Sequence, residues 1–263
     1  MNIIERTWNS SLGKKYVMAI TGMALFVFLI GHLIGNLQVF GPPELINGYA
    51  HFLKSKPAMV WGARLGLLAC VGLHILAAIT LHQLNEAARP VGYAGKGAYG
   101  ASKASQYMLP TGLVILAFIV YHLAHFTALL PGINGVGDFS KLTTTLHGEQ
   151  VPDVYAMMVL GFQVPWVVLF YLVAQALLFV HLGHGLAAMF QSLGFRDHVW
   201  WPRIQLFAKG ASLALLVGYC VIPVAIFLRV VGGDYAERKK FDLKADAGKP
   251  VPALVAVQGK EAK

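Results

Sequence analysis

Histidines are the residues of this sequence whose type and spacing could do chemistry. Seven of the ten lie inside long apolar stretches: His32, His74, His82, His122, His125, His181 and His184. A histidine at membrane depth is energetically costly unless its ring is hydrogen-bonded or binds a metal. A neutral imidazole that bridges two helices is one explanation for a single histidine. Because each of the first four apolar stretches carries at least one, we favour metal ligation.

Four of these histidines are placed at two depths along their stretches. Prolines mark the helix ends on one side of the bundle, and a helix rises about 1.5 Å per residue. Measured from these prolines, His32 and His122 lie about 15 and 13 Å deep, whereas His74 and His181 lie about 25 and 24 Å deep. Two stacked six-coordinate haems need this arrangement, because each iron takes one axial imidazole from each side. The spacing therefore predicts one haem between the shallow pair and one between the deep pair.

The spacing leaves alternatives open. His125 and His184 each follow a predicted ligand by three residues and share its helix face, so either member could be the ligand. A mononuclear zinc or copper site would gather three or four ligands at one height, which the two-depth pattern disfavours. A proton-relay transporter would also use buried histidines, usually with acidic residues in its spans. The apolar stretches of this chain contain almost none.

The elements that carry the histidines are predicted to be membrane-spanning helices. The chain is 57% hydrophobic and only 13% charged, whereas soluble domains carry about 25% charged residues. Five apolar stretches reach the roughly 20 residues that cross a bilayer, at 16–40, 59–84, 107–130, 159–190 and 206–231. We expect an all-α membrane protein whose residues 1–231 form a five-helix bundle around two stacked b haems. A Gly-rich linker at 92–100 joins the second and third helices, and a polar charged tail covers 232–263.

Charge and cysteine usage restrict the function classes. Cys70 and Cys220 lie in apolar stretches and form no CxxC pair, so no iron–sulfur cluster is expected on this chain. Neither a GxGxxG motif after a strand nor a P-loop is present, which argues against a nucleotide or flavin site. With this apolar content, the net charge of +9 suggests anionic lipid or an acidic partner rather than nucleic acid.

The distribution of Lys and Arg predicts the orientation of the helices. Nine lie in the N-terminal segment and in the second and fourth loops, but only three lie in the loops of the opposite side. Cytoplasmic loops carry the excess of basic residues, so we expect a cytoplasmic N-terminus. The basic residues of the C-terminal tail depart from this rule. Arg64, about 10 Å into its helix, needs either an anionic partner or access to the membrane interface.

These residues resemble a known family, the di-haem cytochrome b (b558-type) membrane anchor of succinate dehydrogenases and fumarate reductases, which are succinate:quinone oxidoreductases (complex II). The resemblance covers residues 14–231. It is carried by Thr21-Gly22 ten residues ahead of Gly31-His32-Leu33, by Tyr49-Ala50-His51-Phe52, by Leu73-His74, by Tyr121-His122-Leu123, and by His181 four residues before Gly185-Leu186.

The resemblance implies that His74 and His181 bind the proximal haem, nearest the cytoplasm, and that His32 and His122 bind the distal haem. Its motifs favour these four over the histidines three residues further on. It also implies a bacterial cytoplasmic membrane, a flavoprotein subunit and an iron–sulfur subunit as partners, and a complex able to form a higher oligomer. Electrons then pass between the iron–sulfur subunit and a quinone, typically menaquinone.

Candidates for quinone or further cofactor contacts are Arg64, His51, Glu44, Thr21, His125 and His184. Two rival functions remain at this point. One is a di-haem quinol-oxidising subunit of another respiratory complex, whose soluble partners would differ. The other is a haem-free transporter or scaffold in which the histidines are structural.

Overall fold

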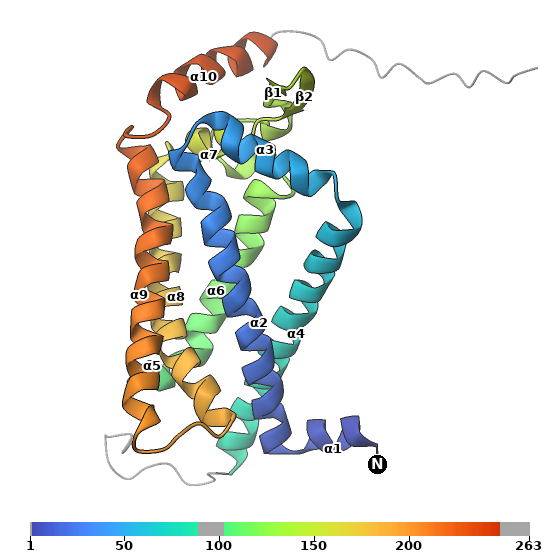
Figure 1. Ribbon diagram of the computed structural model, residues 1–263, viewed down its shortest axis with the longest axis vertical. Coiled ribbons are helices and arrows are strands. Elements are labelled where there is room, and N and C mark those ends of the chain that lie inside the picture. The colour runs from blue at the N-terminus through green and yellow to red at the C-terminus, as the bar shows by residue number, and fades with distance from the viewer. Residues whose placement is uncertain (1, 89–102, 248–263) are drawn as a thin grey trace, which may run out of the picture.

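The chain forms a bundle of long helices closed at one end by a compact cap (Figure 1). The computed structural model describes residues 2–88 and 103–247, so the predicted linker at 92–100 lies outside the described residues. Within this part of the chain, five helices are long and apolar enough to cross a membrane. They are α2 (Ser11–Leu37), α4 (Pro57–Ala87), α6 (Met108–Phe126), α8 (Pro165–Ser192) and α9 (Trp200–Phe227). The expectation of a mainly α-helical, multi-pass membrane protein is confirmed.

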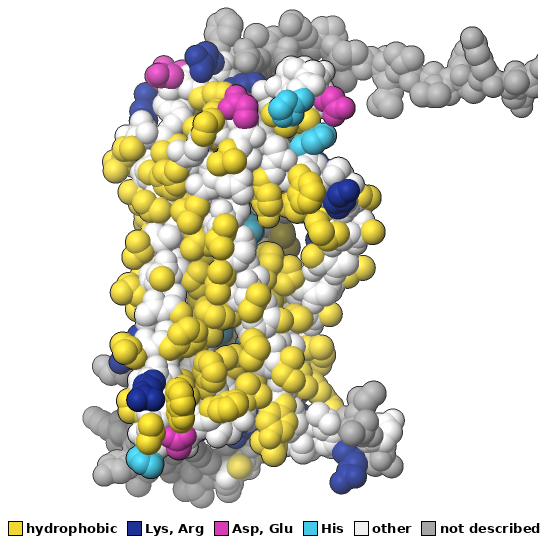
Figure 2. Space-filling model, viewed as in Figure 1, with side chains coloured by type: hydrophobic (Ala, Val, Ile, Leu, Met, Phe, Trp, Pro, Cys, Tyr) yellow, Lys and Arg dark blue, Asp and Glu magenta, His cyan; other side chains and the backbone are white. Residues whose placement is uncertain are grey.

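The outer surface of the bundle is suited to lipid rather than water. Hydrophobic side chains cover the middle of the bundle, and the charged side chains gather towards its two ends (Figure 2). Leu68 and Leu206, for example, are 67% and 74% exposed. Exposed apolar area costs about 25 cal/mol per Å² in water, whereas lipid tails impose no such cost. The apolar belt therefore marks the membrane-embedded part of the chain.

Two prolines set the register of the histidine-bearing helices. Pro57 and Pro165 occupy the first turns of α4 and α8, where the missing N–H has no intrahelical partner to lose. The fourth span therefore begins at Pro165 and not at 159 as predicted. Residues Val154–Gly161 instead form a separate short helix, α7. Asp153 caps its N-terminus, and the Asp153 side chain accepts a hydrogen bond from the backbone N–H of Ala156.

The cap is built from short elements at the end of the bundle where α2 and α6 finish, here called the cap end (Figure 1). It contains α3 (Pro43–Lys54), α7, the strands β1 (Thr143–Leu146) and β2 (Glu149–Pro152), and α10 (Gly233–Ala247). Three short 3₁₀ turns join it to the bundle: η1 (Gln38–Phe40), η2 (Pro131–Ile133) and η3 (Phe139–Lys141). At the opposite end lie α1 (Ile3–Asn9) and α5 (Lys103–Gln106).

The two strands form a hairpin that the sequence analysis did not anticipate. They pair antiparallel, with Thr143 opposite Pro152 and Leu146 opposite Glu149. The connecting residues, His147 and Gly148, have φ angles of 51° and 87°. Positive φ at both central positions is the requirement of a tight two-residue hairpin turn.

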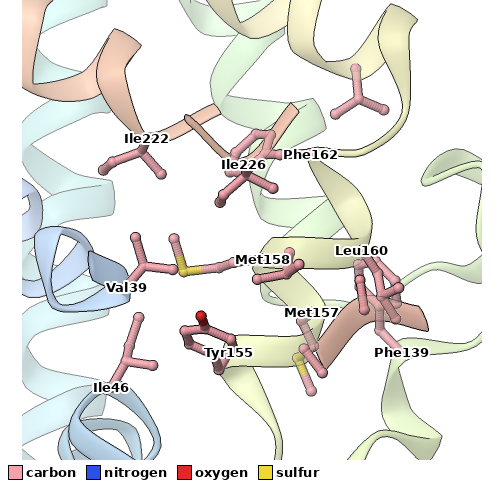
Figure 3. Close-up of a cluster of buried hydrophobic side chains, with 14 of the residues drawn as sticks. Val39, Ile46, Phe139, Tyr155, Met157, Met158, Leu160, Phe162, Ile222 and Ile226 are labelled. Atoms are coloured by element: carbon pink, nitrogen blue, oxygen red, sulfur yellow. The ribbon is translucent and has the colours of Figure 1, made fainter. Parts of the chain in front are cut away.

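A tightly packed hydrophobic core fills the cap. Val39, Ile46, Tyr155, Met158 and Ile226 converge there from η1, α3, α7 and α9, and each is at most 6% exposed (Figure 3). The most apolar windows of α2, α4 and α6 are only 11% buried, against 33% in α9. The densest packing is therefore in the cap, whereas α2, α4 and α6, which carry His32, His74 and His122, pack more loosely.

Helix α10 is docked on the cap through charged groups. The hydroxyl of Tyr235 donates to Oδ2 of the fully buried Asp153 at 2.6 Å, and Nζ of Lys239 lies 3.2 Å from the same oxygen. Lys240 donates to Oε1 of Gln163 at 2.7 Å. Burial, together with Asp153, raises the pKa of Tyr235 above its usual range. Lys239 and Lys240, two of the tail residues that depart from the expected excess of basic residues on the cytoplasmic side, therefore have partners on the cap.

The helices alternate in direction along the bundle. α2 and α6 run towards the cap, and α4 and α8 return from it, so α2–α4 and α6–α8 are two antiparallel hairpins (Figure 1). α9 packs against α8 and α2. α4 leans away from α2 as it approaches the cap (Figure 1), and the surface is hollowed between these two helices in that half of the bundle (Figure 2).

Candidate functional site

Two pairs of histidines meet inside the bundle. The ring centroids of His32 on α2 and His122 on α6 are 5.7 Å apart, with 84° between the ring planes. The centroids of His74 on α4 and His181 on α8 are 6.5 Å apart, with 57° between the planes. The structure thus brings together the same two pairs that the depth argument selects. We call them the cap-side pair (His32 and His122) and the far-side pair (His74 and His181).

The two pairs lie at different heights because of where each helix begins and ends. His32 and His122 are five and four residues before the last residues of α2 and α6, close to the cap. His74 and His181 are seventeen and sixteen residues after the first residues of α4 and α8, which start at the cap. Although the fourth apolar stretch was predicted to begin at 159, α8 begins at Pro165, the proline from which the depth of His181 is measured.

The separations suit two imidazoles that bind one metal from opposite sides. An imidazole nitrogen lies about 2.0–2.1 Å from a bound transition metal, and its ring centre lies about 1.1 Å further out. Two axial rings therefore have centroids about 6.3 Å apart. The observed 5.7 and 6.5 Å lie close to this value on either side. Within the described residues no group of three or more His, Cys, Asp or Glu side chains is arranged to hold one metal ion.

Hydrogen bonds fix the tautomer of His74. Oγ1 of Thr21 donates its only proton to the carbonyl of Val17 at 2.7 Å, so it offers a lone pair to Nδ1 of His74 at 3.2 Å. The carbonyl of Met18 also lies 3.2 Å from this nitrogen. Both groups accept, and Nδ1 must therefore carry the proton. Nε2 keeps its lone pair, which is the state that binds a metal.

His181 has an equivalent environment. Oγ1 of Thr111 donates to the carbonyl of Tyr107 at 2.7 Å and lies 3.2 Å from Nδ1 of His181. The same proton counting leaves the lone pair of His181 on Nε2. In both members of the far-side pair, a threonine of the preceding long helix thus holds the imidazole neutral, with its lone pair on Nε2.

Glycines allow α2 and α6 to approach these rings. A Cβ added at Gly22 would lie 3.2 Å from Cε1 of His74, and one added at Gly112 would lie 3.4 Å from Cε1 of His181. The Thr-Gly sequence therefore does two things at each position. The threonine orients the imidazole of the next long helix, and the glycine leaves the space that the ring occupies.

These equivalences expose an internal repeat that the sequence analysis missed. The segments Met18–Leu33 and Met108–Leu123 share the pattern Met-x2-Thr-Gly-x5-Phe-x3-His-Leu at an offset of ninety residues. The shared phenylalanines, Phe28 and Phe118, stack on the histidines four residues later, with centroids 5.3 and 5.8 Å apart. Comparison of the chain with itself would have identified Thr111 and Gly112 from the sequence.

The cap-side pair has a different set of partners. Nδ1 of His122 lies 3.1 Å from the hydroxyl of Tyr171, and Nδ1 of His125 lies 3.2 Å from the same hydroxyl. His125 is fully buried, and its Nε2 is a buried nitrogen without a hydrogen-bond partner in the described part of the chain. The sequence analysis did not identify Tyr171, whose role depends on contact with a helix almost fifty residues away.

The remaining candidates are dispersed. Arg64 is exposed on α4, with its guanidinium 5.2 Å from the ring centre of Trp61. His51 lies on α3 with its Nε2 3.7 Å from a carboxylate oxygen of Glu149, and Glu44 is exposed on the same helix. Within the described residues no hydrogen bond or ion pair joins Arg64, His51 and Glu44 into one site. They share only the cap-side half of the molecule.

His184 is half-buried one turn after His181, and His74 on α4 pairs with His181 rather than with His184. His82 is exposed and lies 3.3 Å from Glu86 near the end of α4, as expected for an interfacial residue. An open apolar groove of about 430 Å³ lies between α6 and α8 and is lined by Tyr121, Trp166, Leu169, Phe170 and Val173. The chain matches no protein-family model, no curated protein and no solved structure. The geometry of the histidine pairs therefore carries the functional argument.

Proposed function

We propose that this chain is the di-haem cytochrome b membrane anchor of a succinate:quinone oxidoreductase. The observation that carries the proposal is the meeting of four histidines from four helices as two pairs, with ring centroids 5.7 and 6.5 Å apart. Two pairs at two heights match two six-coordinate haems stacked across a membrane. The pairing agrees with the ligand assignment implied by the family resemblance.

The donor set supports a haem, because the far-side imidazoles each keep a lone pair on Nε2 inside an apolar bundle. His32 and His122 would hold the distal haem, and His74 and His181 the proximal one. Bound in this way, the haems would supply one-electron transfer, since two axial imidazoles leave the iron no open position for other ligands. The protein holds each imidazole at its height, sets the tautomer of the far-side pair through Thr21 and Thr111, and surrounds the pairs with apolar helices.

The ends of the bundle support an anchoring role. At the end opposite the cap, cationic groups lie over indole rings: Lys14 over Trp8, Arg196 over Trp201 and Arg203 over Trp200, at 5.0–5.7 Å. Tryptophan and basic residues favour membrane interfaces, and the basic side is usually cytoplasmic. We infer that this end faces the cytoplasm of a bacterium and the flavoprotein and iron–sulfur subunits.

The quinone is proposed to react at the cap end, near the distal haem. Arg64, His51 and Glu44 are the candidate polar contacts, and single replacements test them because the structure does not join them into one site. A quinone-turnover rate that stays at the wild-type value in all three variants removes them from the proposal. Thr21 and His125, the other candidates, already have hydrogen-bonding roles beside the histidine pairs.

A reduced-minus-oxidised absorption spectrum of the purified protein, with haem counted per chain, tests the proposal. We expect two b-type haems in the wild type, one in His32→Ala and one in His74→Ala. His198→Ala, in an exposed loop, is the control and should keep two. Well-folded protein without haem would overturn the proposal and favour a transporter or scaffold. Co-purification with a flavoprotein and an iron–sulfur protein separates a succinate:quinone oxidoreductase from other quinol-oxidising complexes.

A further inference from the structure

A single phenol hydroxyl connects two imidazoles beside the cap-side pair. The oxygen of Tyr171 lies 3.1 Å from Nδ1 of His122 and 3.2 Å from Nδ1 of His125. Tyr171 is 5% exposed and His125 is fully buried, so water does not compete for these bonds. His125 also stacks on Phe126, with ring centroids 3.9 Å apart, which holds its ring in place.

Only two arrangements of this network pair the buried phenol proton with an imidazole. The hydroxyl has one proton to donate, so it donates to one imidazole and accepts from the other. If it accepts from Nδ1–H of His122, it donates to His125, and Nε2 of His122 keeps its lone pair. If the direction is reversed, Nε2 of His122 carries the proton and cannot bind a metal. The direction of one hydroxyl therefore decides whether His122 is a ligand.

The far-side pair has no such choice. Each of its Nδ1 atoms faces a threonine oxygen whose proton is already given to a backbone carbonyl. Those imidazoles donate to fixed acceptors, whereas in the metal-binding arrangement His122 donates to a phenol that in turn donates to a second imidazole. Hydrogen bonds in a chain polarise one another, so the Tyr171 oxygen accepts more strongly when its own proton is donated to His125. A stronger acceptor at Nδ1 of His122 makes that imidazole a more basic ligand.

We propose that Tyr171, with His125 as the acceptor of its proton, is a positioning residue that holds His122 in its metal-binding tautomer and lowers the reduction potential of the group bound by the cap-side pair. This inference rests on the proposed function, because it concerns a haem at that pair. A more basic axial ligand favours the oxidised metal, so the network lowers the potential on the cap side. The far-side pair, which lacks the network, is unaffected by it.

The test is a potentiometric titration of the purified holoprotein carrying Tyr171→Phe. We expect the cap-side haem to become easier to reduce by about tenfold in its reduced-to-oxidised ratio, which is about 59 mV for one electron. The far-side haem should keep its potential. Tyr219→Phe is the matched control, since the Tyr219 hydroxyl lies in the same bundle but donates to the backbone carbonyl of Leu29 at 2.7 Å. Tyr219→Phe should move neither potential.

Selective loss of the cap-side haem in Tyr171→Phe, with both haems retained in Tyr219→Phe, would also support the positioning role. Two haems with unchanged potentials in Tyr171→Phe would refute it and leave the proposed function standing. Wild-type protein without haem would refute both.

A second variant keeps the inference testable if Tyr171→Phe does not fold. His125→Phe suits the aromatic surroundings of Phe126 and Phe139, but it removes the acceptor of the phenol proton. That proton then turns to Nδ1 of His122 and competes with ligation. We expect lower occupancy of the cap-side haem, and wild-type occupancy with wild-type potentials would contradict the inference.

Discussion

Replacement of Gly22 by alanine should weaken binding of the haem that we propose at the far-side pair. The new Cβ would lie 3.2 Å from Cε1 and 3.6 Å from Nδ1 of His74. Carbon atoms in ordinary contact are about 3.5–4.0 Å apart, so the ring must retreat by at least about 0.3 Å. Its Nδ1 is bonded at 3.2 Å to both Thr21 and the carbonyl of Met18, and a retreat stretches both bonds.

The magnitude follows from these bonds. Stretching two contacts of 3.2 Å to about 3.5 Å removes roughly one hydrogen bond, or about 1 kcal/mol. Because this change misplaces a proposed metal ligand, we expect a roughly fivefold loss of haem affinity at the far-side pair, somewhat below the roughly 10–100-fold losses typical of outer-shell mutations. Gly112→Ala starts from a gap of 3.4 Å and should have a smaller effect on its own ligand, His181.

The assay is the rate of haem transfer from the purified protein to an excess of an apo-globin acceptor. Gly210→Ala is the control, because a Cβ there meets nothing within 4 Å. Alanine favours a helix over glycine by up to about 1 kcal/mol, so both variants gain helix stability and only Gly22→Ala should release haem faster. Equal release rates in Gly22→Ala and Gly210→Ala would refute the steric argument.

Three further outcomes are expected. Asp153→Ala should lower the thermal midpoint in detergent by several degrees, because loss of a fully buried carboxylate leaves buried partners unpaired at a cost of about 3–5 kcal/mol; an unchanged melting curve would contradict this. Gly161→Ala places a Cβ 3.1 Å from Nε2 of His125 and should destabilise the cap by about 1–3 kcal/mol, measured in the same way. The hydroxyl of Ser140 donates to Asp138 and lowers the pKa of its carboxyl below 3.8, so this bond stabilises the cap at neutral pH and is lost as pH falls through the lowered pKa. Ser140→Ala should raise that pKa in an NMR titration, and a pKa that does not rise would count against the assignment.

The histidine pairs could be predicted because a helix has a fixed rise. Once prolines mark the helix ends at the cap, the number of residues from that end to each histidine becomes a depth, and histidines at equal depth on neighbouring helices meet. The five spanning helices follow from apolar length alone. Both features depend only on the number of residues within one helix, which can be counted in the sequence.

Contacts between elements were harder to predict. Tyr171 reaches His122 only because α6 and α8 pack at a particular rotation, and periodicity does not specify that rotation. The hairpin was missed because His147-Gly148 is not one of the usual turn dipeptides. The start of α8 was placed six residues too early, since the apolar run continues without interruption from α7 and only Pro165 marks the break. Thr111 is different, because the repeat that identifies it was present in the sequence.

The repeat also has a consequence for assembly. α2–α4 and α6–α8 are quasi-equivalent halves, and each pair takes one histidine from each half, so the arrangement resembles an isologous dimer interface within one chain. Neither half contains a complete ligand set. A group bound at either pair therefore binds only the associated halves and stabilises them by linkage, by about 4 kcal/mol when it is present at a thousandfold its dissociation constant. If the two proposed haems bind, their insertion would therefore be part of folding, and each would join the two halves at a different height.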